Sequence, residues 1–147
     1  MPADDRALND IYMVLDANLN RSKEGLRVCE DIARFHLKNA RLTKKLSLLR
    51  HRITAISRAS SIDHARLFGA RTTETDCGKT FFLGPKRRSF KNIFMANAQR
   101  AKEALRVLEE FFKLLDAGAS KKIQKLRFDL YAIEKQTIKR FPDLLNT

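Results

Sequence analysis

The sequence predicts an all-α fold, in which a duplicated helical hairpin forms a four-helix core with a long ordered loop between its two halves. Residues 17–30 and 96–109 are identical at 9 of 14 positions at a constant offset of 79. Residues 44–56 and 121–133 are identical at 6 of 13 positions at an offset of 77. Both pairs carry apolar residues at the three- and four-residue spacings of amphipathic helices. A repeated pair of helices indicates two hairpins and therefore four helices.

The two hairpins are expected within a single domain that spans residues 1–147. The first should cover residues 9–57, with its long first helix running from about residue 9 to residue 35 because no proline interrupts that stretch. The second should cover residues 90–141. A break between its two helices is expected at residues 116–118, where the chain reads Asp-Ala-Gly.

Residues 61–89 interrupt the helical periodicity and are expected to connect the hairpins. Residues 62–68 could form a short helix, whereas residues 71–78 contain several turn formers and no apolar period. The apolar residues at 80–83 could be a strand-like piece or an anchor in the core. Because a long connection inside a compact domain is usually functional or disordered, and this one carries an apolar anchor, we expect an ordered, functional loop.

The charge balance calls for an anionic partner. Thirty Lys and Arg residues against 17 Asp and Glu give a formal net charge of +13. Nucleic acid, an anionic membrane surface and a phosphorylated small substrate could each account for it. The basic residues are dispersed along helical patterns rather than gathered in long runs, which disfavours nucleic acid.

Composition also indicates the cellular compartment of the protein. No window reaches the roughly 18 apolar residues of a membrane span, and the polar, acidic start does not resemble a secretory signal. Cys29 corresponds to Leu108 of the second copy and is expected in the core, while Cys77 lies in the loop and could be a free thiol. Neither cysteine nor the three histidines have metal-ligand spacing. We therefore expect a cytoplasmic protein without a membrane partner.

Polar residues interrupt the apolar face of the repeated helix in both copies. Asn18 and Arg21, with their counterparts Asn97 and Arg100, fall on the side where burial is expected. Burying an unpaired charge is costly, so each Arg needs a partner or a ligand. One interpretation is a set of core salt bridges to nearby acids, namely Glu24, Glu103, Asp31 and Glu110. We favour a polar pocket that receives an anion, because the planar guanidinium binds phosphate through two hydrogen bonds.

Other charged residues have more than one interpretation. Arg27 and Glu30 fall on the opposite side of the same predicted helix and are expected to form ordinary surface ion pairs. Glu24 lies at the boundary, where it could orient Arg21 or help to hold a metal. Two repeated arginines of the second helices, Arg50 and Arg127, could add to the positive pocket. Asp16 and Asp76 are candidate Mg²⁺ ligands or surface and capping residues.

These motifs resemble the monofunctional hydroxymethylpyrimidine-phosphate kinase domain of thiamine biosynthesis, which is often fused ahead of thiamine-phosphate synthase. The resemblance covers about residues 10–135. It rests on Asp16-Ala-Asn-Leu-Asn-Arg21 with Glu24-Gly-Leu-Arg27, on the loop Arg71…Asp76-x-Gly78, and on the second copy at residues 96–110. The chain lacks the alternating strand–helix pattern of a synthase barrel, so we expect no synthase activity.

The resemblance implies transfer of a phosphoryl group from ATP, with Mg²⁺, to a small phosphorylated pyrimidine. Such catalysis consists mainly of positioning and charge neutralisation. It implies that Arg21 and Arg100 contact phosphate, that Arg71 contacts ATP or the transition state, and that Asp76 is catalytic or binds the metal. Substrate-binding roles follow for Asn18, Asn97, Glu24, Glu103, Arg50 and Arg127. The chain departs from the family at residues 71–73, where it reads Arg-Thr-Thr and the family tends to read Arg-Asp-Thr or Arg-Asp-Ser, so one expected carboxylate is missing.

Two further hypotheses compete with the enzyme. The chain could be a non-catalytic helical domain that partners thiamine-phosphate synthase, or a basic helical module that binds nucleic acid. The second has few aromatic residues available for base stacking. A homo-oligomer is compatible with each of the three hypotheses.

Overall fold

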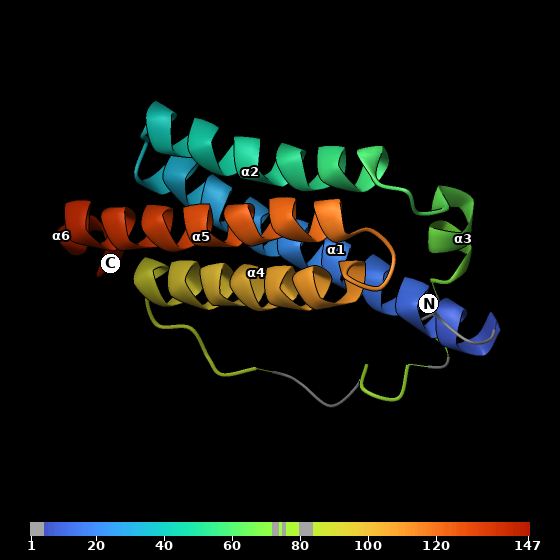
Figure 1. Ribbon diagram of the computed structural model, residues 1–147. Helices are drawn as coiled ribbons and strands as arrows, with labels where there is room; N and C mark the ends of the chain where they lie inside the picture. Colours follow the sequence, from blue (N-terminus) through green and yellow to red (C-terminus); the bar gives the residue numbers. More distant parts are fainter. Residues whose placement is uncertain (1–4, 72–73, 75, 80–83) are drawn as a thin grey trace.

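The predicted all-α fold is confirmed by the computed structural model, which describes residues 5–71, 74, 76–79 and 84–147 (Figure 1). Over these residues the chain forms helices and no strand. The four long helices are α1 (Asp5–Asp31), α2 (Ala40–Ala59), α4 (Phe90–Phe112) and α5 (Ala117–Arg140). Two short helices, α3 (His64–Gly69) and α6 (Pro142–Leu145), follow α2 and α5.

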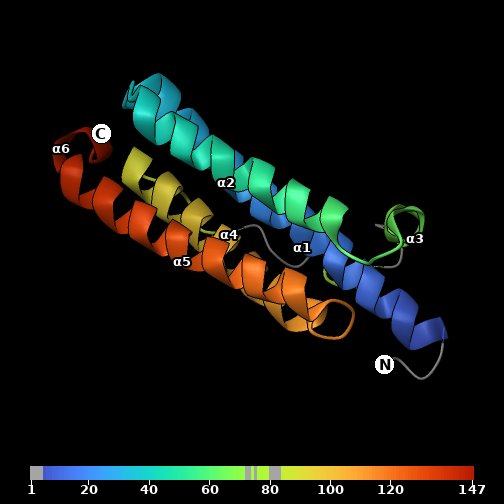
Figure 2. The ribbon, with the colours of Figure 1, turned by 45° about the horizontal axis from the view of Figure 1, so that its top comes forward.

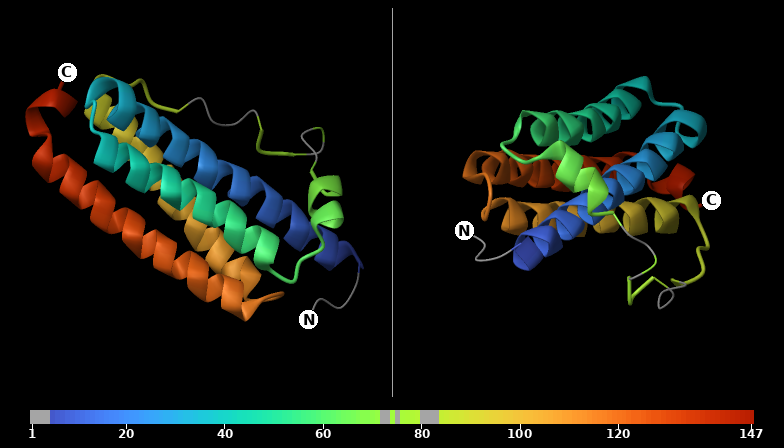
Figure 3. Two further views of the ribbon diagram at one scale, coloured as in Figure 1. Left: turned by 90° about the horizontal axis from the view of Figure 1, so that it is seen from above. Right: turned by 90° about the vertical axis from the view of Figure 1, so that its right-hand side faces the viewer.

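The long helices form a four-helix bundle. α1 packs on α2 and α4, and α5 packs on the same two helices from the other side, so that α1 and α5 lie on opposite corners. Each helix runs antiparallel to both of its neighbours (Figures 1 and 2). In the right half of Figure 3, the described parts of the connection between the hairpins lie on the side of α1 and α4, away from α2. The α1/α4 face and the α2/α5 face are therefore opposite sides of the bundle.

Small residues bring α1 and α4 close together where they cross. Gly25 is buried, and a Cβ atom added to it would lie 2.7 Å from the backbone oxygen of Asn97 and 3.2 Å from the Cβ of Ala101. Because the two helices are antiparallel, equivalent positions of the repeat lie on opposite sides of this crossing. Arg21 and Arg100 lie next to the crossing and therefore line the same groove.

The first helix ends differently from the prediction. α1 is followed directly by a π-helical turn, η1 (Ile32–His36), which adds residues per turn and shifts the helical phase. Continued α-helical periodicity would place Phe35 on the buried side of the helix, but the shifted phase leaves it 63% exposed. Leu26 and Cys29, which precede the turn, are buried as expected.

Helix ends are capped by polar side chains. Asn39 accepts a hydrogen bond from the backbone of Leu42 at the start of α2, and Asp116 accepts one from Ala119 at the start of α5. The expected break at residues 116–118 is wrong in detail, because α4 ends at Phe112 and Gly118 already lies inside α5.

The connection between the hairpins is partly helical, as predicted, since α3 occupies much of the expected segment. The expected apolar anchor at residues 80–83 lies outside the described residues. Within the described part of the chain, no helix has the length and apolar character needed to cross a membrane.

The crossing predicts a steric effect of one methyl group. Gly25→Ala should lower the free energy of unfolding by about 1–3 kcal/mol, because the new Cβ meets backbone atoms that cannot move independently. Gly69→Ala is the matched control, since nothing lies within 4 Å of a Cβ at that position. Urea unfolding followed by circular dichroism measures both. Equal stability of the two variants would contradict the close crossing.

Candidate functional site

A cavity of about 520 Å³ lies over the α1/α4 groove beside the inter-hairpin loop. Asn18 and Arg21 contribute from α1, and Arg100, Glu103, Ala104 and Val107 from α4. Three loop residues, Asp76, Gly78 and Lys79, complete the lining. The structure thus brings together five residues that were singled out from the sequence: Asn18, Arg21, Asp76, Arg100 and Glu103.

Arg21 and Arg100 face the cavity as exposed side chains rather than as buried ones. No carboxylate of the described residues forms an ion pair with either guanidinium. The interpretation that Arg21 and Arg100 are tied into core salt bridges is therefore wrong. Two unpaired arginines on one concave surface attract an anion, and each can hold a phosphate group through two hydrogen bonds.

Asn18 is only 4% exposed, so its predicted burial is confirmed. Its Nδ2 donates to the carbonyl oxygen of Val14 at 2.9 Å, and Asn97 repeats this bond to Ile93 at 2.8 Å. The bond holds the amide against its own helix and leaves the Oδ1 atom to accept a hydrogen bond. Only Asn18 lines the cavity, so the two copies are not equivalent there.

Two of the buried charges that form ion pairs, Glu30 and Glu109, occupy equivalent positions of the repeat. Glu30 is 5% exposed, accepts a hydrogen bond from Arg50 at 3.3 Å and forms an ion pair with Arg27 at 3.1 Å. Each hairpin thus has its first helix tied to its second through one buried carboxylate.

The second copy repeats this arrangement closely. Glu109, 2% exposed, accepts from Arg127 at 2.9 Å and from Arg106 at 3.1 Å. The expectation that Glu30 lies on the solvent side is wrong. Arg50 and Arg127, predicted to bind substrate, instead bond these carboxylates and do not line the cavity beside the loop.

Arg71 is anchored by Asp16. Its Nε and Nη2 donate to the two carboxylate oxygens of Asp16 at 2.9 and 2.8 Å, and its guanidinium lies over the ring of Phe68. Asp16 is 7% exposed, and both of its oxygens are engaged, so a metal ion would compete with Arg71 for them. The pair fixes the start of the loop against α1. Thr72 and Thr73, where the chain departs from the family pattern, lie outside the described residues.

Two carboxylates line the cavity itself. Asp76 Oδ1 accepts from the backbone N–H of Gly78 at 2.9 Å, and Glu103 accepts from Gln99 at 3.2 Å. Glu24 is exposed and does not contribute to the lining. No group of three or more metal-ligating side chains occurs among the residues that the structure describes. One or two carboxylates suffice for Mg²⁺ when substrate phosphates supply the other ligands.

Lys79 is a cavity residue that the sequence analysis missed. One weak indication was its position in the sequence, directly after the Asp76–Gly78 turn. A lone lysine in a chain with 30 basic residues gives no reason to choose it.

Comparison with known proteins agrees with the motifs. The ThiD2 family matches residues 13–136, most of the chain. The chain belongs to the ThiD2 family. No solved structure matches it.

Curated relatives carry a thiamine-related name. The chain is 37% identical over 126 residues to a thiamine-phosphate synthase of Nostoc punctiforme, covering 84% of the chain and 34% of the relative. It is 34% identical over 124 residues to that of Rhodopirellula baltica, covering 83% and 32%. The chain therefore spans about a third of the length of these relatives. The thiamine context is confirmed, whereas none of these names is that of a kinase.

The two cysteines should differ sharply in reactivity. Burial raises the pKa of Cys29 to about 12, and its thiol donates to the carbonyl oxygen of Phe94. Cys77 is exposed. Iodoacetamide at neutral pH should alkylate Cys77 in the native protein and both cysteines in urea, because the thiolate is the reactive form. Mass spectrometry of the peptides measures this. Native alkylation of Cys29 would contradict the packing of α1 on α4.

Proposed function

We propose that this ThiD2-family chain is an enzyme of thiamine biosynthesis that transfers a phosphoryl group from ATP to hydroxymethylpyrimidine phosphate. The observation that carries the proposal is that Arg21 and Arg100 line one cavity and have no ion-pair partner among the described residues. The family match and the names of the relatives supply the pathway.

The reaction is a displacement at phosphorus. An oxygen of the substrate monophosphate forms a bond to the γ-phosphorus of ATP as the bond to the β–γ bridging oxygen breaks, and ADP leaves. Several phosphate groups must approach one another despite their negative charge, so the enzyme must supply positive charge and alignment. Arg21, Arg100 and Lys79 provide three cations around the cavity.

The other cavity residues have complementary roles in this proposal. The Oδ1 of Asn18 accepts a hydrogen bond from the exocyclic amine of the pyrimidine, since its Nδ2 is already committed to the helix backbone. Asp76 and Glu103 are the carboxylates that would hold Mg²⁺. When bound, that ion neutralises phosphate charge as it develops on the leaving group. Asp16 acts by positioning Arg71, which begins the loop beside the cavity.

A second candidate is a non-catalytic domain that partners thiamine-phosphate synthase. It is favoured by the relatives, in which the matching segment makes up about a third of a longer chain. Co-purification with a synthase, together with the absence of any turnover, would support this candidate over the kinase.

The kinase proposal predicts that Arg21→Ala and Arg100→Ala each reduce kcat/KM by about 100-fold or more, because each removes a cation that acts on the transferred group. Helix content should stay unchanged, since both side chains are exposed and neither forms an ion pair with a described residue. A coupled assay of ADP release, with ATP, Mg²⁺ and the pyrimidine monophosphate, measures the effect.

Arg27→Ala is the matched control. It removes an arginine from the same repeated helix that pairs with Glu30 and does not line the cavity. Its turnover should stay within about threefold of the wild type, since Arg50 still pairs with Glu30 and Arg27 does not line the cavity. Wild-type protein that consumes no ATP with this substrate would overturn the proposal, and so would equal losses in all three variants.

A further inference from the structure

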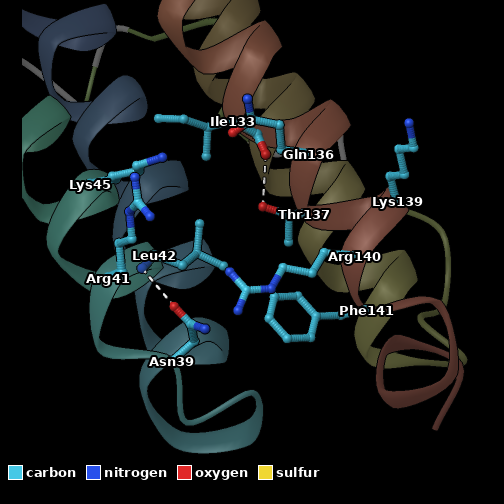
Figure 4. Close-up of a pocket in the computed structure, with 10 residues that line it drawn as sticks. All are labelled: Asn39, Arg41, Leu42, Lys45, Ile133, Gln136, Thr137, Lys139, Arg140 and Phe141. Atoms are coloured by element: carbon cyan, nitrogen blue, oxygen red, sulfur yellow. Dashed lines mark hydrogen bonds between the residues drawn. The ribbon is translucent and has the colours of Figure 1, made fainter.

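A second cavity, of about 500 Å³, lies on the opposite side of the bundle from the arginine cavity. It opens between the first turns of α2 and the last turns of α5 (Figure 4). Four basic residues line it: Arg41 and Lys45 from α2, and Lys139 and Arg140 from α5. None of the residues assigned to phosphoryl transfer contributes to it.

Among the residues that the structure describes, no acidic one lines this second cavity. None of its four basic residues forms an ion pair within the part of the chain that the structure describes. Arg41 and Lys45 are four residues apart on one helix, where like charges repel. Arg140 reaches from α5 across the gap toward α2 (Figure 4). Like charges gathered without counter-charge in a concave site raise the local concentration of anions.

The duplicated fold supplies an internal comparison. Asn39 caps α2 beside the second cavity, and Asp116 caps α5 at the equivalent position of the other half. At Asp116 the chain closes over the helix end, since Ser61 donates its backbone N–H to Asp116 at 2.9 Å and its hydroxyl to Leu115 at 3.2 Å. The end at Asn39 has a neutral cap and an open cavity with basic walls. The two halves therefore differ here in charge and in access.

The remaining walls are suited to a flat organic group. Leu42 is buried, and Ile133 and Phe141 are half-buried beside it. The guanidinium of Arg140 lies 5.1 Å from the centre of the Phe141 ring, so a planar stacking surface is present. Asn39 Oδ1 and the Thr137 hydroxyl are committed to the backbone of Leu42 and Ile133 (Figure 4). The amide of Gln136 is exposed and can bond the edge of a ring.

We propose that this second cavity binds a nucleoside di- or triphosphate, separately from the site of phosphoryl transfer. Arg41, Lys45 and Arg140 hold the phosphates, and the surface of Leu42, Ile133 and Phe141 holds the base. A single phosphate would leave most of the positive charge uncompensated. The volume of about 500 Å³ admits a small molecule that carries both groups. The proposal goes beyond the kinase function and does not depend on it.

The test measures ATP binding by calorimetry in full-length protein that carries Arg21→Ala and Arg100→Ala, so that the reaction cavity is impaired. One ATP should still bind. Adding Lys45→Gln and Arg140→Gln should weaken that binding by about tenfold or more, because two charge-assisted contacts are lost.

The matched control adds Arg52→Gln and Lys125→Gln instead, which remove one exposed charge from each of the same helices outside the cavity. It should leave the ATP affinity within about threefold, as expected for distant surface charges. Circular dichroism checks that both proteins keep their helices. Equal weakening in the two proteins, or none in either, would overturn the site.

Further ligands test which parts of the nucleotide the cavity binds. AMP should bind much more weakly than ATP, and inorganic triphosphate should bind more weakly than ATP because it lacks the base. Triphosphate that binds as tightly as ATP would overturn the assignment of the apolar wall. An RNA oligonucleotide that binds the cavity where ATP does not would overturn the small-molecule proposal. Failure of the kinase assay would leave these measurements unaffected.

Discussion

The close approach of α1 and α4 at Gly25 is the constraint on which the rest of the molecule depends. A Cβ atom at that position would lie 2.7 Å from a backbone oxygen of the facing helix, so only glycine allows this separation. The crossing joins the two duplicated hairpins, which pack most extensively through these two helices. It also determines the site, because Arg21 and Arg100 belong to different halves of the chain and meet only where these helices cross. Core packing and the candidate chemistry thus rest on the same contact.

Repeated charges of the two copies fall into two physical classes. Glu30 and Glu109 are buried, and each forms ion pairs with an arginine of its own helix and with one of the next helix. A buried carboxylate without such partners would cost several kcal/mol, so these residues are retained together as a unit that fixes each hairpin. Arg21 and Arg100 have no such partner among the described residues. Repetition alone therefore does not identify function, since it preserves structural ion pairs as readily as binding residues.

Much of the fold could be predicted from the sequence, because a repeated amphipathic period specifies both the number of helices and their pairing. The helical wheel failed where it assumed that one side of a helix is buried along its whole length. Arg21 lies on the inner side of α1 but faces an open groove, so it is exposed. Glu30 lies on the side of α1 that the helical period predicts to face solvent, but α2 covers it. The α-helical period predicts the wrong exposure for Phe35 because the π-helical turn changes the phase of the helix. No residue type in that segment predicts such a turn.

The described part of the loop makes the two halves of the α1/α4 groove unequal. Two equivalent hairpins would form two equivalent half-grooves, one beside Asn18 and one beside Asn97. Among the described loop residues, Asp76, Gly78 and Lys79 line the cavity beside Asn18. Asp16 holds Arg71 at the start of this loop, and the second copy has Met95 where the first has Asp16. The ion pair that anchors the start of the loop is therefore specific to the first copy. This asymmetry is compatible with the proposed reaction, because its two phosphorylated substrates differ and a symmetric groove would offer both the same surroundings.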